Sequence, residues 1–455
     1  MVDALKASAA EAKRDRGITY LAGDTAHFES YADLLRHARH VLGGLHRVGI
    51  KQGEALVMQV VELRELVHAI WGCFIGGISP VNISTPARYE LQNAVFQKLL
   101  GVLDNLNSRH LLASPANLDP LRRLLPQTKE GKHTTVHDLA GLDTSSPAVH
   151  EPHIRSGDVL FYQLTSGSTG RSKCIPERHC AVISHLRHSI VHCGYSEADV
   201  SCNWLPFDHV VPMLTFHLQD VYLARRAVEI STADVLADPL LWVRAMARYS
   251  VSHSWAPNFG FKLVAAALEA EGAGGATRGV GILDLSALKR LMNAGEQVTT
   301  EVNAAFLRAL RLDESVMQPA FGMAEVCTCM TYNNDYDSSK SFAIDKDSLT
   351  APTLRLAVGG DGRAVMQFVD LGPPSPGVEI RIAKNGGSEQ VDELQVGHLQ
   401  IRAPCVMVGY HDNPSANAEC YPGERNAPKL RQPYSLADPT PSPHESLPLA
   451  RRRLV

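Results

Sequence analysis

The chain has 455 residues, of which 45% are hydrophobic and 20% charged, with a formal net charge of −4. This length allows about three units of ordinary domain size with a substantial core, and the balanced charge argues against a nucleic-acid partner. The nine scattered cysteines do not have the spacing of a usual zinc site and indicate free thiols. The N-terminus lacks the apolar core of a secretory signal, and no apolar run suits a membrane span. We therefore expect a cytoplasmic protein without stable membrane insertion.

Helix and strand patterns alternate along the first 350 residues. Apolar residues recur at helical spacing over 30–49, and a short continuous apolar strand follows over 54–61. Later segments with strand or helix character occupy 62–83, 158–164, 179–193, 200–206, 239–251, 252–257 and 287–295. Such alternation predicts an α/β fold with mostly parallel sheets. We expect an α/β body over 1–350 that comprises two subdomains.

The pattern changes from about position 351 onward. Shorter apolar runs broken by glycine and proline predict antiparallel strands, which would form a small, β-barrel-like subdomain over 351–415. The remaining segment is rich in proline and poor in large apolar side chains. It cannot bury enough surface to offset its ordering entropy, so we expect a disordered tail over 416–455.

A run of small and hydroxylated residues directly follows the apolar strand over 158–164. Glycines let successive backbone N–H groups turn toward one point, and hydroxyls add donors, so the run is suited to cradle an anion. Lys173 adds a positive charge. A plain Ser/Gly turn between strand and helix is the alternative, whereas a Walker A loop and a hydrolase elbow both fail on spacing. The run consists of Thr165, Ser166, Gly167, Ser168, Thr169 and Gly170.

The stretch LTSGSTGRSK (164–173) resembles the phosphate-loop signature of the adenylate-forming superfamily. That superfamily unites acyl-CoA synthetases, peptide-synthetase adenylation domains and luciferases. Three later stretches resemble further motifs of the superfamily in the right order, namely LMNAGEQV (291–298), QPAFGMAEVC (318–327) and GHLQIRAPCVMVGY (397–410). The resemblance implies the large N-terminal domain of such an enzyme, and it makes ATP and Mg²⁺ the expected cofactors.

The resemblance also implies a role for individual residues. Residues 165–170 would hold the β- and γ-phosphates of ATP, with Lys173 at the same loop. An aromatic face suits a purine and a carboxylate suits a hard cation. For Phe321, an aromatic side chain packed in the core is the alternative. The remaining implied roles are adenine stacking by Phe321 beside Gly322, ligation of Mg²⁺ by Glu325 and Thr165, and lining of the nucleotide side by Gly295 and Glu296.

Two further stretches resemble the substrate side of fatty acyl-AMP ligases and of loading adenylation domains. In SWAPNFGFKLV (254–264), the residues Asn258, Phe259 and Gly260 would border the acyl pocket. In WLPFDHVVPM (204–213), His209 would lie near the substrate carboxylate and the route of the acceptor thiol. A structural histidine is an equal alternative for His209.

The implied reaction is attack of a carboxylate oxygen on the α-phosphorus of MgATP, which releases pyrophosphate and forms an acyl-adenylate. The acyl group would then pass to the thiol of CoA or of a carrier protein's phosphopantetheine, in a secondary-metabolite or lipid pathway. The sequence departs from the family at Ser172-Lys173-Cys174, where Pro-Lys-Gly is usual, and 424–455 does not resemble the expected hinge and C-terminal lid domain. The alternatives are a weakly active or inactive ATP- and acid-binding relic, or one half of a split enzyme that receives a C-terminal domain in trans.

Overall fold

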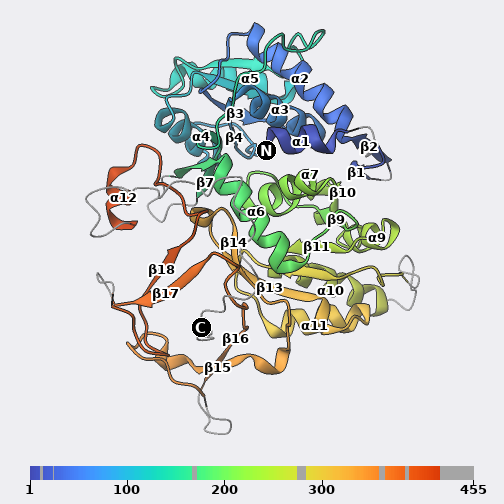
Figure 1. Ribbon diagram of the computed structural model, residues 1–455, viewed down its shortest axis with the longest axis vertical. Coiled ribbons are helices and arrows are strands. Elements are labelled where there is room, and N and C mark those ends of the chain that lie inside the picture. The colour runs from blue at the N-terminus through green and yellow to red at the C-terminus, as the bar shows by residue number, and fades with distance from the viewer. Residues whose placement is uncertain are drawn as a thin grey trace.

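The computed structural model describes residues 1–10, 14–23, 25–165, 172–273, 283–357, 364–384 and 389–420. Figure 1 shows the chain running from an N-terminal α/β layer at the top, through a second α/β layer in the middle, to β-hairpins at the lower left. No helix in these ranges is long and apolar enough to cross a membrane. All nine cysteines are free thiols, as the sequence indicated.

The upper layer is built on a four-stranded sheet in the order β4-β3-β5-β6, in which all neighbouring strands are parallel. The apolar segment at 54–61 forms a buried strand, and the segment at 62–83 forms a helix followed by a second strand. Strands and helices therefore alternate along the chain in this layer. Its strands are β3 (Ala55–Gln59), β4 (Ser79–Asn82), β5 (His110–Ala113) and β6 (Thr135–Asp138). Its helices are α2 (Tyr31–Arg47), α3 (Leu63–Gly76), α4 (Ala94–Asn105), α5 (Pro115–Leu124) and the 3₁₀ turn η2 (Leu125–Gln127).

The middle layer is an eight-stranded sheet in the order β14-β13-β12-β11-β9-β10-β1-β2. The six inner strands are parallel to their neighbours, and the two edge strands, β2 and β14, are antiparallel. The predicted α/β fold with mostly parallel sheets is therefore confirmed. The strands are β1 (Gly17–Ala22), β2 (Thr25–Ser30), β9 (Val200–Asn203), β10 (Arg226–Ile230), β11 (His253–Ala256), β12 (Arg290–Asn293), β13 (Met317–Gly322) and β14 (Cys329–Tyr332).

Helices lie against this large sheet (Figure 1), and buried aromatic and aliphatic side chains form hydrophobic clusters around it. All four tryptophans are buried: Trp71 in one hydrophobic cluster with Trp255, and Trp204 in another with Trp242. The helical segments are α1 (Val2–Ser8), α6 (His179–Cys193), the π-helical η3 (Val211–Leu218), α7 (Gln219–Leu223), α8 (Thr232–Ala237), α9 (Leu240–Arg248), α10 (Asn258–Ala273), α11 (Thr300–Leu310), and the 3₁₀ turns η4 (Glu314–Val316) and η5 (Ala324–Val326).

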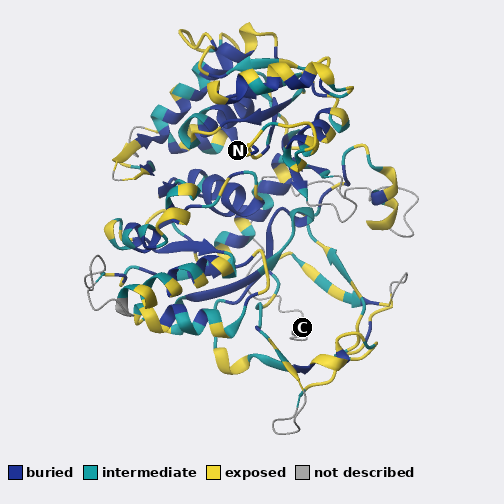
Figure 2. Cartoon of the chain, turned by 180° about the vertical axis from the view of Figure 1, so that it is seen from behind, coloured by how far each residue is buried: buried dark blue, intermediate teal, exposed yellow. Residues whose placement is uncertain are grey.

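The remaining strands form antiparallel pairs. The first pair, β7 (Val159–Thr165) and β8 (Lys173–Arg178), flanks the small-residue loop. The predicted antiparallel strands are β15 (Phe342–Asp345) with β16 (Val365–Phe368) and β17 (Glu379–Ala383) with β18 (His398–Arg402). The 3₁₀ turn η6 (Ser338–Lys340) precedes β15, and η7 (Lys346–Ser348) follows it. Figure 2 shows that burial is concentrated in the α/β layers, whereas β16 to β18 carry mostly intermediate and exposed residues.

The end of the described chain differs from the expectation of disorder over 416–455. Helix α12 (Pro414–Cys420) continues into that segment. It is tied to the preceding chain by Asn417, whose side chain accepts a hydrogen bond from the Tyr410 N–H at 2.7 Å and donates one to the Tyr410 carbonyl at 2.9 Å. Side-chain hydrogen bonds to the backbone thus supply the order that the composition did not predict. Residues 421–455 lie outside the described part of the chain.

Candidate active site

Four neighbouring strands of the large sheet end at one edge, and the candidate residues follow those ends. The neighbours are β9, β11, β12 and β13, which run parallel to one another. Asn258 follows β11, Gly295 follows β12, and Phe321 and Gly322 complete β13. In open α/β sheets, ligands bind outside the carboxyl ends of the strands. The fold therefore brings the predicted adenine-side and acyl-side residues to the edge where a ligand is expected.

The small-residue loop closes a β-hairpin. Thr165 ends β7 and lies directly opposite Lys173, which begins β8. The predicted phosphate-binding residues 166–170 lie outside the described residues, so only the two ends of the loop are placed. Because the flanking strands are antiparallel, the loop returns the chain to a strand and does not open a helix, contrary to the plain strand-to-helix turn considered from the sequence.

Lys173 and Glu325 both contact one tyrosine, Tyr410. The Lys173 ammonium lies 4.6 Å from the centre of the Tyr410 ring, a cation–π distance. The Tyr410 hydroxyl donates a hydrogen bond of 2.6 Å to Glu325 Oε1. Burial, followed by the hydrogen bond to Glu325, raises the pKa of Tyr410, so the phenol keeps its proton for this carboxylate. Tyr410 was not predicted as a site residue, although it ends the GHLQIRAPCVMVGY motif.

The turn that directly follows Glu325 has an uncommon backbone. Cys327 has a φ of +69° and a ψ of −70°, and the Thr328 N–H donates to the Val326 carbonyl at 2.9 Å. These are the features of a γ-turn of the rare, strained kind. The Glu325 carbonyl accepts a hydrogen bond of 2.8 Å from the Met407 N–H, which ties the turn to the segment before Tyr410. Strain of this kind persists only where surrounding contacts impose it.

Gly322 lets the two strands beside this turn come together. A Cβ added at Gly322 would lie 2.0 Å from the Thr328 carbonyl oxygen, which is backbone and cannot swing aside. The pairing of β13 with β14 also shifts register between Phe321 and Gly322. The adenine-stacking role expected for Phe321 stays a prediction, and its half-buried side chain sits at this bulge.

A buried carboxyl group, Glu177, lies behind the turn. It is on β8 and only 2% exposed, and its Oε2 accepts a hydrogen bond of 3.3 Å from the Cys327 thiol. Burial raises the pKa of Glu177 to about 8, so the group is mainly protonated at neutral pH. Glu177 was not predicted as a site residue, because a glutamate in SKCIPERHC carries no local signal of burial.

The acyl-side and nucleotide-side residues meet at the start of α10. The Asn258 side-chain oxygen accepts hydrogen bonds from the Asn293 side chain at 3.2 Å and from the Thr299 N–H at 3.3 Å. The Glu296 carboxylate accepts one of 2.6 Å from the Phe259 N–H. Such a carboxylate at a helix N-terminus satisfies a free N–H and complements the helix dipole. Glu296 thus joins the turn after β12 to the helix after β11, a structural contact that the sequence did not suggest.

An aromatic corner borders the same helix. The Phe259 side chain is 41% exposed and meets the Trp204 ring edge-on, with ring centres 6.0 Å apart. Gly260 is buried, and a Cβ there would come within 2.9 Å of the Trp204 ring. Phe259 therefore presents an apolar face to solvent. Gly260, which has no side chain, allows the start of α10 to lie close to Trp204.

His209 lies in the turn that leads into η3. The residue is exposed, and its ring stacks on Trp255 with centres 6.1 Å apart and planes 24° apart. The neighbouring Asp208 carbonyl accepts a hydrogen bond of 2.9 Å from Gln163, a buried residue of β7. This bond ties the His209 turn to the strand that ends at Thr165. His209 is thus held near the hairpin, in a position open to solvent.

Surface hollows elsewhere contain none of these residues. One of about 200 Å³ lies beside α2, and another of about 270 Å³ lies beside α11. The candidate site is an open edge of the sheet, which agrees with the exposure of Phe259, Gly295 and His209.

Comparison with known proteins decides the family. The profile of the family described as AMP-binding enzyme matches residues 6–411, which is most of the chain. The chain belongs to the AMP-binding enzyme family. Membership places it among the adenylate-forming ligases, and it confirms the resemblance that the four motifs indicated.

This AMP-binding chain is similar to fungal synthetases of secondary metabolism. It is 26% identical to atromentin synthetase invA5 of Paxillus involutus over 87% of this chain and 39% of that protein. It is 27% identical to nonribosomal peptide synthetase pngA of Aspergillus terreus over 89% of this chain and 40% of that protein. It is also 27% identical to inactive atromentin synthetase invA3 of Paxillus involutus, over 81% and 36% respectively. The chain spans about two fifths of the length of these curated relatives.

Solved structures support the same conclusion. The adenylation domain of a keto acid-selecting NRPS module, bound to keto acyl adenylate, is 28% identical with a TM-score of 0.81, over 92% of this chain and 75% of that one. McyG A-PCP, complexed with phenylalanyl-adenylate, is 29% identical with a TM-score of 0.79, over 92% and 61%. The fatty acid AMP ligase from Legionella pneumophila, 22% identical with a TM-score of 0.80 over 92% and 71%, shares the fold.

Proposed function

We propose that this AMP-binding chain activates a carboxylic acid as an acyl-adenylate, using ATP and releasing pyrophosphate. The observation that carries the proposal is the arrangement of Lys173, Tyr410 and Glu325 beside the end of the β7–β8 hairpin. A cation and a carboxylate at the mouth of a loop rich in backbone donors suit a bound polyphosphate and its metal.

Adenylate-forming enzymes use ATP and Mg²⁺, and the donor groups here fit that cation. Among the described residues, Glu325 accepts one side-chain hydrogen bond, through Oε1 from Tyr410, which leaves Oε2 for a hard cation. Glu325 is half-buried, and the Thr165 hydroxyl belongs to the same hairpin end as Lys173. Glu325 and Thr165 would hold Mg²⁺, which would neutralise charge on the phosphates.

The chain's own residues would act by positioning and by charge. A substrate carboxylate oxygen forms a bond to the α-phosphorus, and the bond from that phosphorus to the bridging oxygen breaks, so pyrophosphate leaves with the electron pair. Lys173 would offset the charge that develops on the phosphates. Tyr410 would hold the Glu325 carboxylate in one orientation through its 2.6 Å hydrogen bond. His209, exposed beside the hairpin, would contact the substrate carboxylate.

For the acid, we propose one with an aromatic or otherwise apolar side chain. Asn258, Phe259 and Gly260 form the start of α10, where Phe259 exposes an aromatic face beside Trp204. Apolar walls with a few polar groups are usual for such pockets. Keto acyl and phenylalanyl adenylates in the similar structures agree with this choice. Homologous adenylation domains work with carrier-protein domains, so a phosphopantetheine thiol is the proposed acceptor, with CoA as the alternative.

A second candidate is supported by one of the relatives, because a protein 27% identical to this chain is named an inactive synthetase. On this reading the chain binds ATP and an acid without appreciable turnover. The geometry of Lys173, Tyr410 and Glu325 is compatible with binding as well as with reaction. Direct measurement of turnover separates the two candidates.

The test is acid-dependent pyrophosphate release with hydroxylamine present to trap the adenylate, across aryl, 2-keto and fatty acids. We expect release with an apolar acid. Lys173→Ala and Glu325→Ala should each lower the rate about a hundredfold or more, because each removes a charge positioned at the phosphates. Lys129→Ala, which removes an exposed lysine after α5, is the matched control and should keep the wild-type rate.

The outcomes separate the candidates. Pyrophosphate release that survives in Lys173→Ala and Glu325→Ala would contradict the assigned site. ATP binding without release for any acid would overturn the adenylating function and leave the binding protein. Tyr410→Phe keeps the ring under Lys173 but removes the hydroxyl, so we expect a smaller loss, about tenfold, from the freed Glu325 carboxylate.

A further inference from the structure

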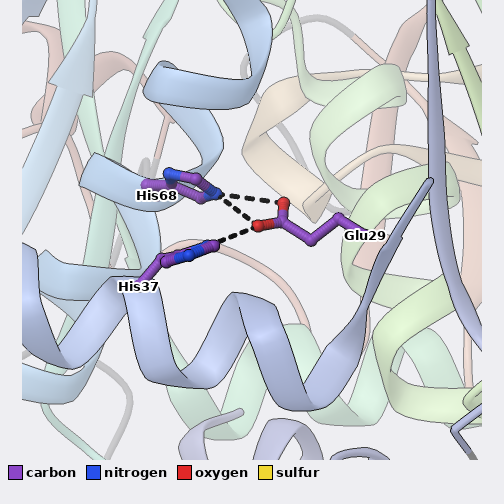
Figure 3. A group of neighbouring side chains, drawn as sticks. All are labelled: Glu29, His37 and His68. Atoms are coloured by element: carbon purple, nitrogen blue, oxygen red, sulfur yellow. Dashed lines mark hydrogen bonds and ion pairs between the residues drawn. The ribbon is translucent and has the colours of Figure 1, made fainter. Parts of the chain in front are cut away.

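Three side chains outside the candidate active site converge on one point (Figure 3). Glu29 of β2 is 2% exposed, yet it carries a carboxylate. Its Oε1 lies 2.6 Å from His37 Nδ1 and 2.7 Å from His68 Nε2, and its Oε2 lies 3.0 Å from the same His68 nitrogen. The two imidazole rings are 4.7 Å apart between centres. One carboxylate and two imidazoles thus face one another from three separate elements.

The packing of α2 against α3 brings the two histidines together. A Cβ added at Gly72 of α3 would lie 3.1 Å from the Ala38 carbonyl oxygen of α2, so the missing side chain allows a close approach there. His37 precedes Ala38 by one residue, and His68 precedes Gly72 by one helical turn. The carboxylate arrives from β2, which leads into α2 through the capping residue Ser30.

The charge state of the group suits a cation. Burial opposes ionisation of Glu29, but the hydrogen bonds from His68 and His37 outweigh it and lower the pKa of the carboxyl. Burial also lowers the pKa of His37, which favours the neutral imidazole. At neutral pH the cluster therefore offers an anionic oxygen and neutral ring nitrogen as ligand atoms.

We propose that Glu29, His37 and His68 form a binding site for a divalent transition-metal ion of the Zn²⁺ class. Two imidazoles and one carboxylate are a common ligand set for such ions. Mg²⁺ prefers oxygen ligands and is not expected to bind. His68 and Glu29 side chains are 14% and 1% exposed, whereas His37 is 32% exposed, so water can reach a fourth position from the His37 side.

The site needs only a small adjustment to accept the ion. Tetrahedral ligands about 2.1 Å from a metal lie about 3.4 Å apart, so each imidazole nitrogen now hydrogen-bonded to Glu29 would move from the carboxylate oxygen by less than about 1 Å. All the ligand atoms already lie within 4.8 Å of one another, so the set would close around the ion. Each imidazole proton that now points at Glu29 would move to the other ring nitrogen. The Arg36 guanidinium lies 3.5 Å from His37 Nε2, and with its side chain 59% exposed it has room to turn away.

Arg64 competes with the metal for the same carboxylate. Its Nε lies 3.7 Å from Glu29 Oε1, and its side chain is 35% exposed. A guanidinium so close repels a second cation, so the proposal predicts that Arg64→Ala binds the metal more tightly than the wild type. A bound ion would also connect edge strand β2 of the large sheet to α2 and α3, and so raise the thermal midpoint.

The experiment titrates the purified full chain with Zn²⁺ and with Mg²⁺, and records the visible absorption of bound Co²⁺ as a probe of nitrogen and oxygen coordination. We expect about one equivalent of Zn²⁺. His37→Ala and His68→Ala should each weaken binding at least about tenfold and remove the Co²⁺ bands. The control is His110→Ala, which breaks an imidazole pair at 2.9 Å that includes His137. Within the described part of the chain, this pair has no carboxylate partner.

Several results would overturn the proposal. The first is Zn²⁺ binding to His37→Ala that is as tight as binding to the wild type, and the second is loss of binding in His110→Ala instead. The others are weaker binding in Arg64→Ala and no Zn²⁺ binding to the folded wild type. His68→Gln guards against misfolding, because its amide can still donate to Glu29. This variant should keep the metal-free thermal midpoint close to that of the wild type and still lose the rise in midpoint on adding Zn²⁺.

Discussion

Replacing Glu177 by glutamine tests the electrostatics of the candidate site. The Glu177 carboxyl is buried on β8, and Cys327 of the strained turn donates a hydrogen bond to it at 3.3 Å. Its pKa in the folded protein is raised from 4.5 to about 8, chiefly by burial. Glutamine has the same shape as the protonated acid and cannot ionise. The substitution therefore removes the titration with little change in packing.

The magnitude follows from the difference between the two pKa values. The unfolded chain loses this proton near pH 4.5, and the folded chain loses it near pH 8. Between these values the unfolded state binds fewer protons, so the stability of the wild type falls as pH rises through this window. At about 1.4 kcal/mol per pKa unit, the contribution lost by pH 9 is about 3–5 kcal/mol. Below pH 4.5 both states hold the proton, and the contribution is fully present.

The assay compares thermal midpoints of wild type and Glu177→Gln from pH 5 to pH 9. The thermal midpoints of the two proteins should lie close together at pH 5. Above pH 5 the variant should become progressively more stable than the wild type, and the difference in unfolding free energy should reach about 3–5 kcal/mol at pH 9. The control Glu301→Gln changes an exposed residue in the first turn of α11 and should run parallel to the wild type. Parallel pH profiles for wild type and Glu177→Gln would refute the reasoning.

Three further substitutions probe close packing and a buried ion pair. Gly322→Ala places a Cβ 2.0 Å from the Thr328 carbonyl oxygen, so we expect a loss of about 2–4 kcal/mol of unfolding free energy. Gly101→Ala, where a Cβ meets nothing within 4 Å on an exposed helix face, should instead gain up to about 1 kcal/mol. Arg225→Met leaves the Asp220 carboxylate without its buried partner and should cost about 3–5 kcal/mol by chemical denaturation. A loss below about 1 kcal/mol would show that water reaches Asp220.

Much of the fold follows from local patterns. Apolar spacing over 30–49 predicted α2, and the alternating segments that followed correspond to strands and helices of both parallel sheets. The hairpin β1–β2 was not predicted. It precedes the four-stranded sheet in sequence, yet β1 joins the large sheet by pairing Ile18 with Ala227. A strand pair so distant in sequence leaves no trace in local periodicity.

Some residues of the candidate site could likewise be proposed from the sequence, and others only from the structure. Lys173 and Glu325 could be proposed because each belongs to a short motif whose residue types suit phosphate and metal chemistry. Tyr410 and Glu177 could not be proposed, because their importance comes from contacts with residues far along the chain. The same holds for Glu296, whose contact with the Phe259 N–H gives it a structural role beside the expected one.

The sequence by itself determined the family and the α/β class of this protein, because motifs and periodicity are local properties of the chain. Only the tertiary structure decided which side chains share an environment. It placed Lys173 on the ring of Tyr410, closed the small-residue loop as a hairpin, and gathered Glu29 with two histidines from separate helices. Burial and long-range contacts set the charge, strain and ligand geometry of such groups, and these depend on packing rather than on neighbours in sequence.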